Sequence, residues 1–172
     1  KEIFFPKKGI LSQSAEAKGK KINATIGMAL EDNGKPMVLA GIRDMIHCAN
    51  PEEGFSYAPS FGHPDLRKAW AEKMLKQNPS LKGKAVSLPV VSSALTHGIS
   101  MAAYLFADEG DPVVTPDYYW ENYDLIFTNA CHSNLKMFPT FEGKSFNISA
   151  MKNIISKESG EKVILILNFP NN

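Results

Sequence analysis

The sequence predicts an α/β protein whose mostly parallel sheet is flanked by helices, and two features of the chain support this prediction. From residue 86 onward, short apolar runs alternate with longer amphipathic runs, and strands separated by helices usually join into a parallel sheet through right-handed crossovers. The apolar run at 163–167 contains no polar residue, which favours a central strand that is covered on both faces.

Composition argues against several classes of protein. The 172 residues are 44% hydrophobic and 22% charged, which is typical of a globular domain. With 19 Lys+Arg against 18 Asp+Glu, the net charge of +1 lacks the basic excess that nucleic-acid binding usually requires, so we expect no nucleic-acid partner. No run approaches the roughly 20 apolar residues that span a bilayer, so we expect no membrane association.

The cysteines and histidines predict neither a metal site nor a disulfide framework. Cys48 and Cys131 lack the spacing of a metal knuckle, and two cysteines are too few for a disulfide scaffold. We therefore expect a reducing, cytoplasmic compartment. The four histidines form no cluster or triad in the sequence, and His97 is expected to be a polar surface or supporting group and not a catalytic base.

Short elements are predicted before residue 86. Residues 1–11 have the composition of an arm, in which Pro6 prevents a helix. Apolar residues recur at helical spacing over 65–77, which predicts an amphipathic helix that ends before Pro79. The other predicted elements are a helix over 12–18 that Gly19 ends, a strand over 21–27 and a turn over 31–36.

After residue 86, predicted strands and helices alternate. Ligands of such sheets bind beyond the carboxyl ends of the strands, where we expect Ser92, Asp117 and Asn171. The predicted strands cover 86–91, 112–115, 135–138 and 162–169, and the predicted helices cover 94–108, 120–130 and 148–158.

The junction VVSSALTHG (90–98) has the composition of an anion site. Here the chain leaves a strand and enters a helix through small and hydroxyl residues, so free backbone N–H groups at the helix start can hold a phosphate. The alternative is that Ser92 or Ser93 only caps the helix. The sequence contains neither a Walker motif nor G-x-G-x-x-G, so we predict no nucleotide site of those kinds.

The stretch PDYYWENY (116–123) places four aromatic side chains just beyond a predicted strand. One of these rings can stack on a flat cofactor. The alternative is that the rings fill the interface between the sheet and its helices, where most aromatic side chains lie. The four residues are Tyr118, Tyr119, Trp120 and Tyr123.

Together these segments resemble the N-terminal half of class I, aspartate-aminotransferase-like enzymes, which belong to the fold-type I superfamily of pyridoxal-phosphate enzymes. Residues 21–39 resemble the strand and turn that lead to a glycine over the substrate carboxylate, which implies this role for Gly27. YAPSFGHPDLR (57–67) matches the family pattern Y-x-x-x-x-G-x-x-x-L-R. The match implies that Tyr57 contacts the cofactor phosphate of the neighbouring subunit in a homodimer.

The resemblance implies further cofactor contacts. ALT (94–96) falls where the family has its phosphate-binding turn, usually Gly-Ser/Ala-Gln/Thr, which implies phosphate contacts from the backbone N–H of Leu95 and from Thr96. The W-x-N-Y segment at 120–123 resembles the motif whose first residue, here Trp120, stacks on the pyridine ring. LNFPNN resembles the start of the N-P-N-N-P-T-G run, which implies that Asn172 hydrogen-bonds the phenolic oxygen of the cofactor.

The chain departs from the family pattern in two respects. Ala94 and Leu95 replace smaller or more polar residues of the phosphate-binding turn. In the family, the lysine that forms the Schiff base, the aspartate that pairs with the pyridine nitrogen and the arginine that binds the substrate carboxylate all come later in the chain. The catalytic lysine is therefore expected beyond Asn172, and the segment alone is expected to be inactive.

The resemblance implies that the whole protein transfers an amino group between an amino acid and a 2-oxo acid, with pyridoxal 5'-phosphate as cofactor. Residues 1–45 are expected to form an N-terminal arm and the start of a small domain, and residues 46–172 the first half of the cofactor-binding large domain. Two alternatives stay open. One is another fold-type I reaction on an amino acid, such as that of a β-lyase or a synthase, and the other is a non-catalytic α/β binding domain.

Overall fold

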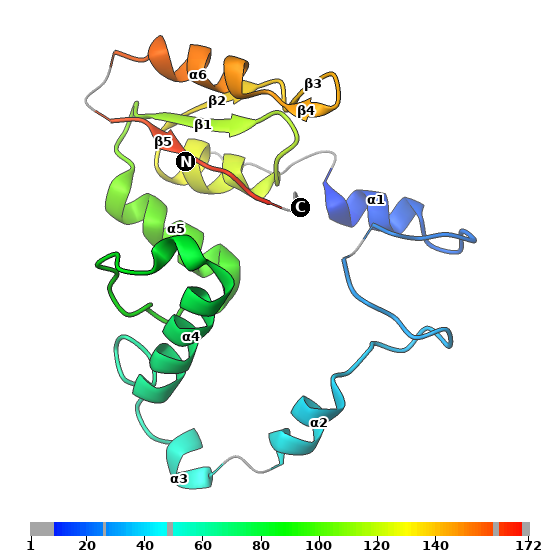
Figure 1. Ribbon diagram of the computed structural model, residues 1–172. Coiled ribbons are helices and arrows are strands. Elements are labelled where there is room, and N and C mark those ends of the chain that lie inside the picture. Colours follow the sequence, from blue (N-terminus) through cyan, green and yellow to red (C-terminus); the bar gives the residue numbers. More distant parts are fainter. Residues whose placement is uncertain (1–8, 26, 48–49, 160–161, 170–172) are drawn as a thin grey trace. The chain divides into compact units, whose positions relative to one another are not determined.

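The computed structural model describes residues 9–25, 27–47, 50–159 and 162–169, and the chain divides into two compact units (Figure 1). The first unit ends at Val91 and the second begins at Ser92. This boundary does not test the expected division of a larger enzyme into residues 1–45 and residues 46–172. That division stays a prediction.

The second unit contains a parallel sheet of three strands. They are β1 (Pro112–Pro116), β2 (Asn134–Phe138) and β5 (Ile164–Leu165), in the order β2-β1-β5. β1 pairs in parallel with both neighbours, and all five of its residues are buried. The prediction of an α/β fold with a parallel sheet is therefore confirmed.

Helices cover both faces of this sheet. α6 (Ile148–Ser156) packs over β1 and β2 on one face, while η2 (Asp124–Ala130) lies against β2 on the other and α5 (Ala94–Phe106) packs on η2 (Figure 1). On the face of the sheet that η2 covers, the core is built around Val113. Val114 is equally buried but lies outside this core cluster, because successive side chains of a strand point to opposite faces. The core cluster consists of Ala103, Val113, Tyr123, Ile126 and Phe127.

The helix predicted over 120–130 differs from the observed structure. Trp120 and Tyr123 form a turn, in which the N–H of Tyr123 donates to the carbonyl of Trp120 at 2.9 Å, and the helix that follows is wound as a π-helix. A π-helix has wider i→i+5 turns and is rare. Over only seven residues, the spacing of apolar residues does not distinguish a π-helix from an α-helix.

The strand predicted over 162–169 is also shorter than expected. β5 pairs over two residues only, and Leu165 and Leu167 are 38% and 43% exposed. The expectation of a strand covered on both faces is therefore wrong within the described residues. β5 lies at the edge of the observed sheet, next to β1, so one side of its backbone is without a partner strand there.

A small hairpin precedes α6 and was not predicted. Its strands are β3 (Phe141–Glu142) and β4 (Ser145–Phe146), which pair antiparallel around Gly143 at φ 61°. Phe146 packs edge-on against Phe138, with a distance of 5.8 Å between ring centroids, and against Phe169, at 5.2 Å. The hairpin thereby covers the end of β2.

The first unit is mainly helical. The helix predicted over 65–77 is confirmed as α4, one residue longer at its start, and the predicted turn over 31–36 is confirmed by two backbone hydrogen bonds of 2.8 Å that Glu31 makes, one with Lys35 and one with Gly34. The predicted arm falls mostly on residues 1–8, outside the described residues, and α1 begins at Ile10. The helices are α1 (Ile10–Glu16), α2 (Ala40–Ile46), α3 (Pro51–Gly54), α4 (Pro64–Gln77) and η1 (Pro79–Leu81).

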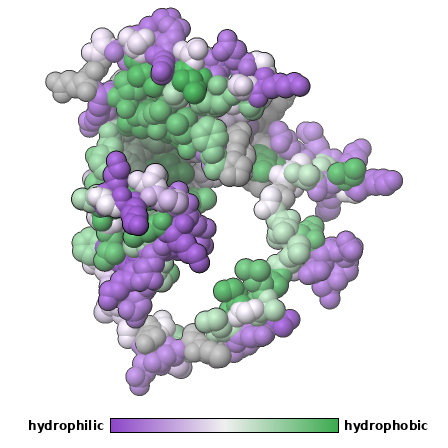
Figure 2. Space-filling model, in the orientation of Figure 1, coloured by the Kyte–Doolittle hydropathy of each residue, from purple (hydrophilic) through white to green (hydrophobic). Residues whose placement is uncertain are grey.

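Two strands predicted in the first unit are absent from its described residues. Residues 21–25 and 27 have no strand pairing, and residues 86–91 are irregular. A strand requires a partner with which to exchange hydrogen bonds, and the local pattern of side chains does not supply one. Apolar side chains of this unit also remain on the surface, as Figure 2 shows around α2, where Leu39 is 77% exposed.

Candidate functional site

The segment 84–91, which leads into the predicted phosphate turn, is held by hydrogen bonds to Arg67 and Phe61 and not by a sheet. Arg67 donates from Nε to the carbonyl of Pro89 at 2.6 Å, and the N–H of Val91 donates to the carbonyl of Phe61 at 3.0 Å. Gly62 has φ 93°, and an added Cβ would lie 2.2 Å from Val91 Cγ2, so only glycine fits there. The glycine and arginine of the 57–67 motif therefore fix the path of the chain as it approaches Ser92.

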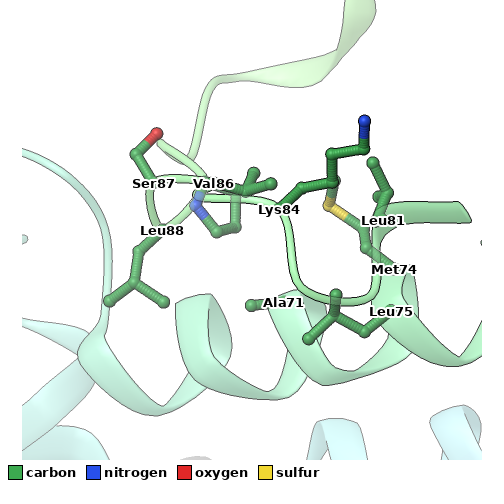
Figure 3. A pocket seen from close by; sticks show the side chains of 9 residues that line it. Ala71, Met74, Leu75, Leu81, Lys84, Val86, Ser87 and Leu88 are labelled. Atoms are coloured by element: carbon green, nitrogen blue, oxygen red, sulfur yellow. The ribbon is translucent and has the colours of Figure 1, made fainter.

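A small apolar cavity lies between α4 and this segment (Figure 3). It has a volume of about 100 Å³, and Ala71, Met74 and Leu75 of α4 form one of its walls. Most of the lining is apolar, and Lys84 and Ser87 are not joined there by a second acid–base group, so we assign no reaction to this cavity. The rest of its lining comes from Leu81, Lys84, Val86, Ser87, Leu88 and Pro89.

The turn at residues 92–98 opens the second unit and leads into α5. The N–H of Ala94 donates to the carbonyl of Ser92 at 3.0 Å, and Ser92 Oγ donates to the carbonyl of Ala94 at 3.1 Å. Ser93 occupies the N-cap position, but its side chain makes no capping bond. The alternative that a serine hydroxyl only caps this helix is therefore wrong. The N–H of Ser93 instead donates to Nδ1 of His97, at 3.0 Å.

Ala94 adopts a backbone conformation that favours glycine. Its φ of 66° lies in the left-handed region, which costs a residue with a Cβ about 1–2 kcal/mol. The resemblance described above aligns Ala94 with a position where glycine is usual. Alanine does not favour this conformation, so neighbouring hydrogen bonds must support it.

The turn leaves backbone donors available at the start of α5. No described residue accepts a hydrogen bond from the N–H of Leu95 or Thr96, and both residues are exposed, Leu95 by 79%. Free N–H groups at the positive end of a helix can bind an anionic group such as a phosphate. Together with the hydroxyl of Thr96, these donors match what a phosphate needs.

The carboxyl end of β1 is fastened to the end of β2 by Asp117 and Thr140. Oδ1 of Asp117 accepts from the N–H of Thr140 at 2.9 Å and from its hydroxyl at 2.5 Å, and Thr140 Oγ1 accepts from the N–H of Tyr118 at 3.2 Å. The hydroxyl of Thr140, followed by its backbone N–H, lowers the pKa of Asp117. This group of bonds fixes the start of the aromatic segment.

The aromatic residues of this segment divide into two groups. Tyr123 is buried in the core, and the hydroxyl of Tyr119 donates to Asp124 at 2.8 Å, so these two rings fill the interface as the alternative interpretation expects. Burial, followed by the bond to Asp124, raises the pKa of Tyr119 to about 12. Trp120 is half-buried, with its ring edge-on to Tyr123 at 5.8 Å, and Tyr118 is exposed.

The remaining predicted site residues lie elsewhere. Tyr57 is fully exposed and lines an open hollow of the first unit with Asn50, Ser56 and His63. Gly27 is in the same unit, and a Cβ added there would meet nothing within 4 Å. Leu95, Thr96 and Trp120 belong to the second unit, where α5 and Trp120 pack against one core cluster. Asn172 and Asn171 lie outside the described residues.

A second polar cluster lies at the amino ends of the strands. Lys162 Nζ is 2.6 Å from Asp108 Oδ2 and 2.9 Å from Asp111 Oδ2, near the amino ends of β5 and β1. The N–H of Asp108, followed by Lys162, lowers the pKa of Asp111. These bonds join the segments that precede the two strands.

Sequence reasoning missed the contacts of His97 and Thr140. His97 was expected to be a polar surface or supporting group, and the structure shows which group it supports, the N–H of Ser93. The spacing of four residues between Ser93 and His97 is a usable signal, because it places the two within one helical turn. Thr140 gives no such signal, since it lies 23 residues from Asp117.

The part of the chain that the structure describes contains neither a metal-binding cluster nor a membrane-spanning helix. Within residues 9–25, 27–47, 50–159 and 162–169, no group of three or more His, Cys, Asp or Glu side chains is placed to hold a metal ion. None of the helices in this part of the chain combines the length and the apolar character required to cross a membrane.

Known proteins resemble this chain in both sequence and structure. It is 32% identical to a probable aspartate/prephenate aminotransferase of Aquifex aeolicus, over 67% of this chain and 28% of that protein. It is 29% identical to an LL-diaminopimelate aminotransferase of Dehalococcoides mccartyi, over 91% and 39%. The solved structure of an aminotransferase from Anaerococcus prevotii superposes with a TM-score of 0.81 and 28% identity, over 94% of this chain and 40% of that one.

The chain spans less than half the length of each of these relatives. The family model for aminotransferases of class I and II matches residues 19–172, which include the turn before α5 and the aromatic segment after β1. The chain therefore belongs to the class I and II aminotransferase family.

Proposed function

We propose that this chain is part of a pyridoxal-phosphate-dependent aminotransferase, which transfers an amino group between an amino acid and a 2-oxo acid. The observation that carries the proposal is the turn before α5, where no described residue accepts from the N–H groups of Leu95 and Thr96, in a chain of an aminotransferase family. When bound, pyridoxal phosphate supplies an electron sink for the negative charge that forms at the amino acid Cα.

The residues of the second unit would hold the phosphate and the ring of the cofactor. The N–H of Leu95 and the N–H and hydroxyl of Thr96 would donate to phosphate oxygens, which are strong acceptors. Trp120 would stack on the pyridine ring, and its contact with Tyr123 fixes the indole for that purpose. The bonds between Asp117 and Thr140 hold the segment that carries this indole in place.

Three more residues complete the proposal. Gly27 would let the substrate carboxylate approach the backbone closely, because glycine has no side chain. Tyr57, which is fully exposed on this chain, would reach the cofactor phosphate of a second subunit in a homodimer. Asn172 would donate to the phenolic oxygen of the cofactor. The lysine that moves the proton would lie beyond Asn172, so residues 1–172 alone should not catalyse transfer.

An absorbance titration of the full-length protein tests this function. We expect pyridoxal phosphate to produce a band near the visible edge that shifts when an amino acid is added, with transfer that requires a 2-oxo acid. Consumption of the amino acid without a 2-oxo acid would indicate a lyase or synthase instead. A protein that stays colourless with added cofactor would contradict the proposal and favour a non-catalytic binding domain.

The variants Thr96→Ala and Thr25→Ala make a matched pair for this titration. Thr96 lies on the proposed phosphate turn, whereas the hydroxyl of Thr25 donates to the side chain of Asn23 at 2.7 Å, elsewhere in the chain. We expect Thr96→Ala to weaken cofactor binding by about ten- to a hundredfold, as the loss of one hydrogen bond to a charged group implies, and Thr25→Ala to leave it unchanged. Light scattering of the full-length protein tests the proposed homodimer.

A further inference from the structure

We propose that His97 is a positioning residue for the phosphate turn. Its imidazole accepts a hydrogen bond from the N–H of Ser93, and this bond would hold Ala94 in the left-handed conformation. The N–H groups of Leu95 and Thr96 would thereby stay directed at the phosphate. This inference rests on the proposed function, because it assigns a role toward the phosphate of the cofactor.

The geometry of the imidazole supports this role. His97 lies in the first turn of α5, and Nδ1 receives the N–H of Ser93 at 3.0 Å, so the side chain reaches back over the turn that precedes the helix. A ring nitrogen that accepts an N–H carries no proton, which places the ring proton on Nε2. The side chain therefore closes a loop that contains Ala94, Leu95 and Thr96.

Ala94 requires the support that this loop gives. A residue with a Cβ disfavours a φ of 66°, and the turn has three bonds that oppose its relaxation. Two of them run between Ser92 and Ala94, at 3.0 and 3.1 Å, and the third is the bond from Ser93 to His97. Of these three, the third reaches furthest into α5, because His97 lies four residues beyond Ser93.

Loss of the imidazole therefore has a defined consequence. The N–H of Ser93 would lose its acceptor, and Ala94 would relax toward the conformations that alanine prefers. Because hydrogen bonds are directional, the donors that follow would then point away from the phosphate oxygens. The ring of the cofactor is expected to be held by Trp120, so its binding would change little.

Comparing two ligands isolates this effect in the full-length protein. Pyridoxal phosphate and pyridoxal share the same ring, and only the first has a phosphate. We expect His97→Ala to weaken the affinity for pyridoxal phosphate by about tenfold, and to change the affinity for pyridoxal by less than about twofold.

Three further variants separate positioning from general stability. His97→Asn keeps an acceptor near the position of Nδ1 and should retain most of the affinity. The double variant with Ala94→Gly and His97→Ala should regain part of it, because glycine adopts a positive φ without support. His132→Asn removes another exposed histidine of the second unit, at φ 57°, and should change neither affinity.

The outcomes distinguish this inference from the proposed function. If the wild-type protein binds neither ligand, the proposed function fails and the role of His97 fails with it. If the wild-type protein prefers the phosphorylated ligand and His97→Ala preserves that preference, only the role of His97 is wrong. An equal loss of affinity for both ligands would likewise overturn the positioning role and indicate a general loss of structure.

Discussion

The two compact units of the chain bury their apolar side chains to different degrees. In the second unit, Val113, Val114 and Phe138 are each 2% exposed or less, and helices cover the sheet on both faces. In the first unit, the described residues of α2 and α4 include none that is buried, and Phe55 is 94% exposed. Exposed apolar surface of this extent is typical of segments that pack against other protein surfaces.

This difference shows where the candidate site obtains its rigidity. The turn before α5 and Trp120 belong to the unit that has its own core, so their geometry depends on packing within that unit. Tyr57 and Gly27 belong to the unit with exposed apolar surface. We therefore expect mutations in the second unit to affect local stability more than comparable mutations in the first.

Phe138→Ala should produce the largest effect. The ring is 2% exposed and packs on Phe146, so its removal should destabilise the second unit by about 3–5 kcal/mol. Amide hydrogen exchange of β1 and β2 in the full-length protein measures this local stability. Phe55→Ala in the first unit is the matched control and should change stability by less than about 0.5 kcal/mol. Similar effects of the two variants would contradict the comparison.

Thr140→Val should have the next largest effect. Valine keeps the shape of Thr140 but removes the hydroxyl that Asp117 and Tyr118 share, which should cost about 1–2 kcal/mol at neutral pH. Because folding lowers the pKa of Asp117, the stabilisation is present above the ordinary pKa of 3.8 and is lost as pH falls through the lowered value. The gap between wild type and variant in urea midpoint should therefore narrow in acid. A gap that does not change with pH would show that the charge of Asp117 contributes nothing.

Tyr119→Phe should have a smaller effect, confined to alkaline solution. The pKa of Tyr119 is about 12 in the folded chain against an ordinary value of 10.0, so ionisation in the unfolded chain lowers stability as pH rises between these values. The variant should lose this part of the alkaline decline, and should cost under about 1 kcal/mol at neutral pH. Absorbance of tyrosinate, recorded during alkaline titration, follows the ionisation directly. An equal loss of stability at high pH in both proteins would contradict this role of Tyr119.

Ala94→Gly should have the smallest effect and the opposite sign. Glycine relieves the left-handed conformation of Ala94 but increases the entropy of the unfolded chain, so a net gain of about 0.5 kcal/mol is expected. Ala102→Gly, in the same helix, should destabilise by about 1 kcal/mol. Thermal unfolding compares the two. If both variants destabilise equally, the turn at Ala94 is not strained.

Local sequence patterns correctly predicted those helices and strands that pack against another element of the described structure. β1 and α5 were predicted close to their observed bounds, because the buried strand and the helix that helps to cover its sheet satisfy each other's apolar faces. The strand predicted over 86–91 failed for the opposite reason. Arg67 and Phe61 make hydrogen bonds with its backbone where a neighbouring strand would do so, and no pattern within 86–91 reveals that.

The candidate site could be predicted only in part. The free donors of Leu95 and Thr96 follow from the position of a helix start, which the sequence shows. The left-handed conformation of Ala94 does not follow from its sequence, because alanine there predicts an ordinary helical residue. The bond from Thr140 to Asp117 depends on the pairing of β1 with β2, which is a property of the folded sheet.

The π-helical winding of η2 has a consequence for how the length of this chain can change in evolution. Each turn of a π-helix contains about one more residue than a turn of an α-helix. Between Trp120, which we propose to stack on the cofactor, and β2, η2 is thus a segment where losing a residue converts one winding into the other. Insertions and deletions can be absorbed there while the indole and the strand keep their places.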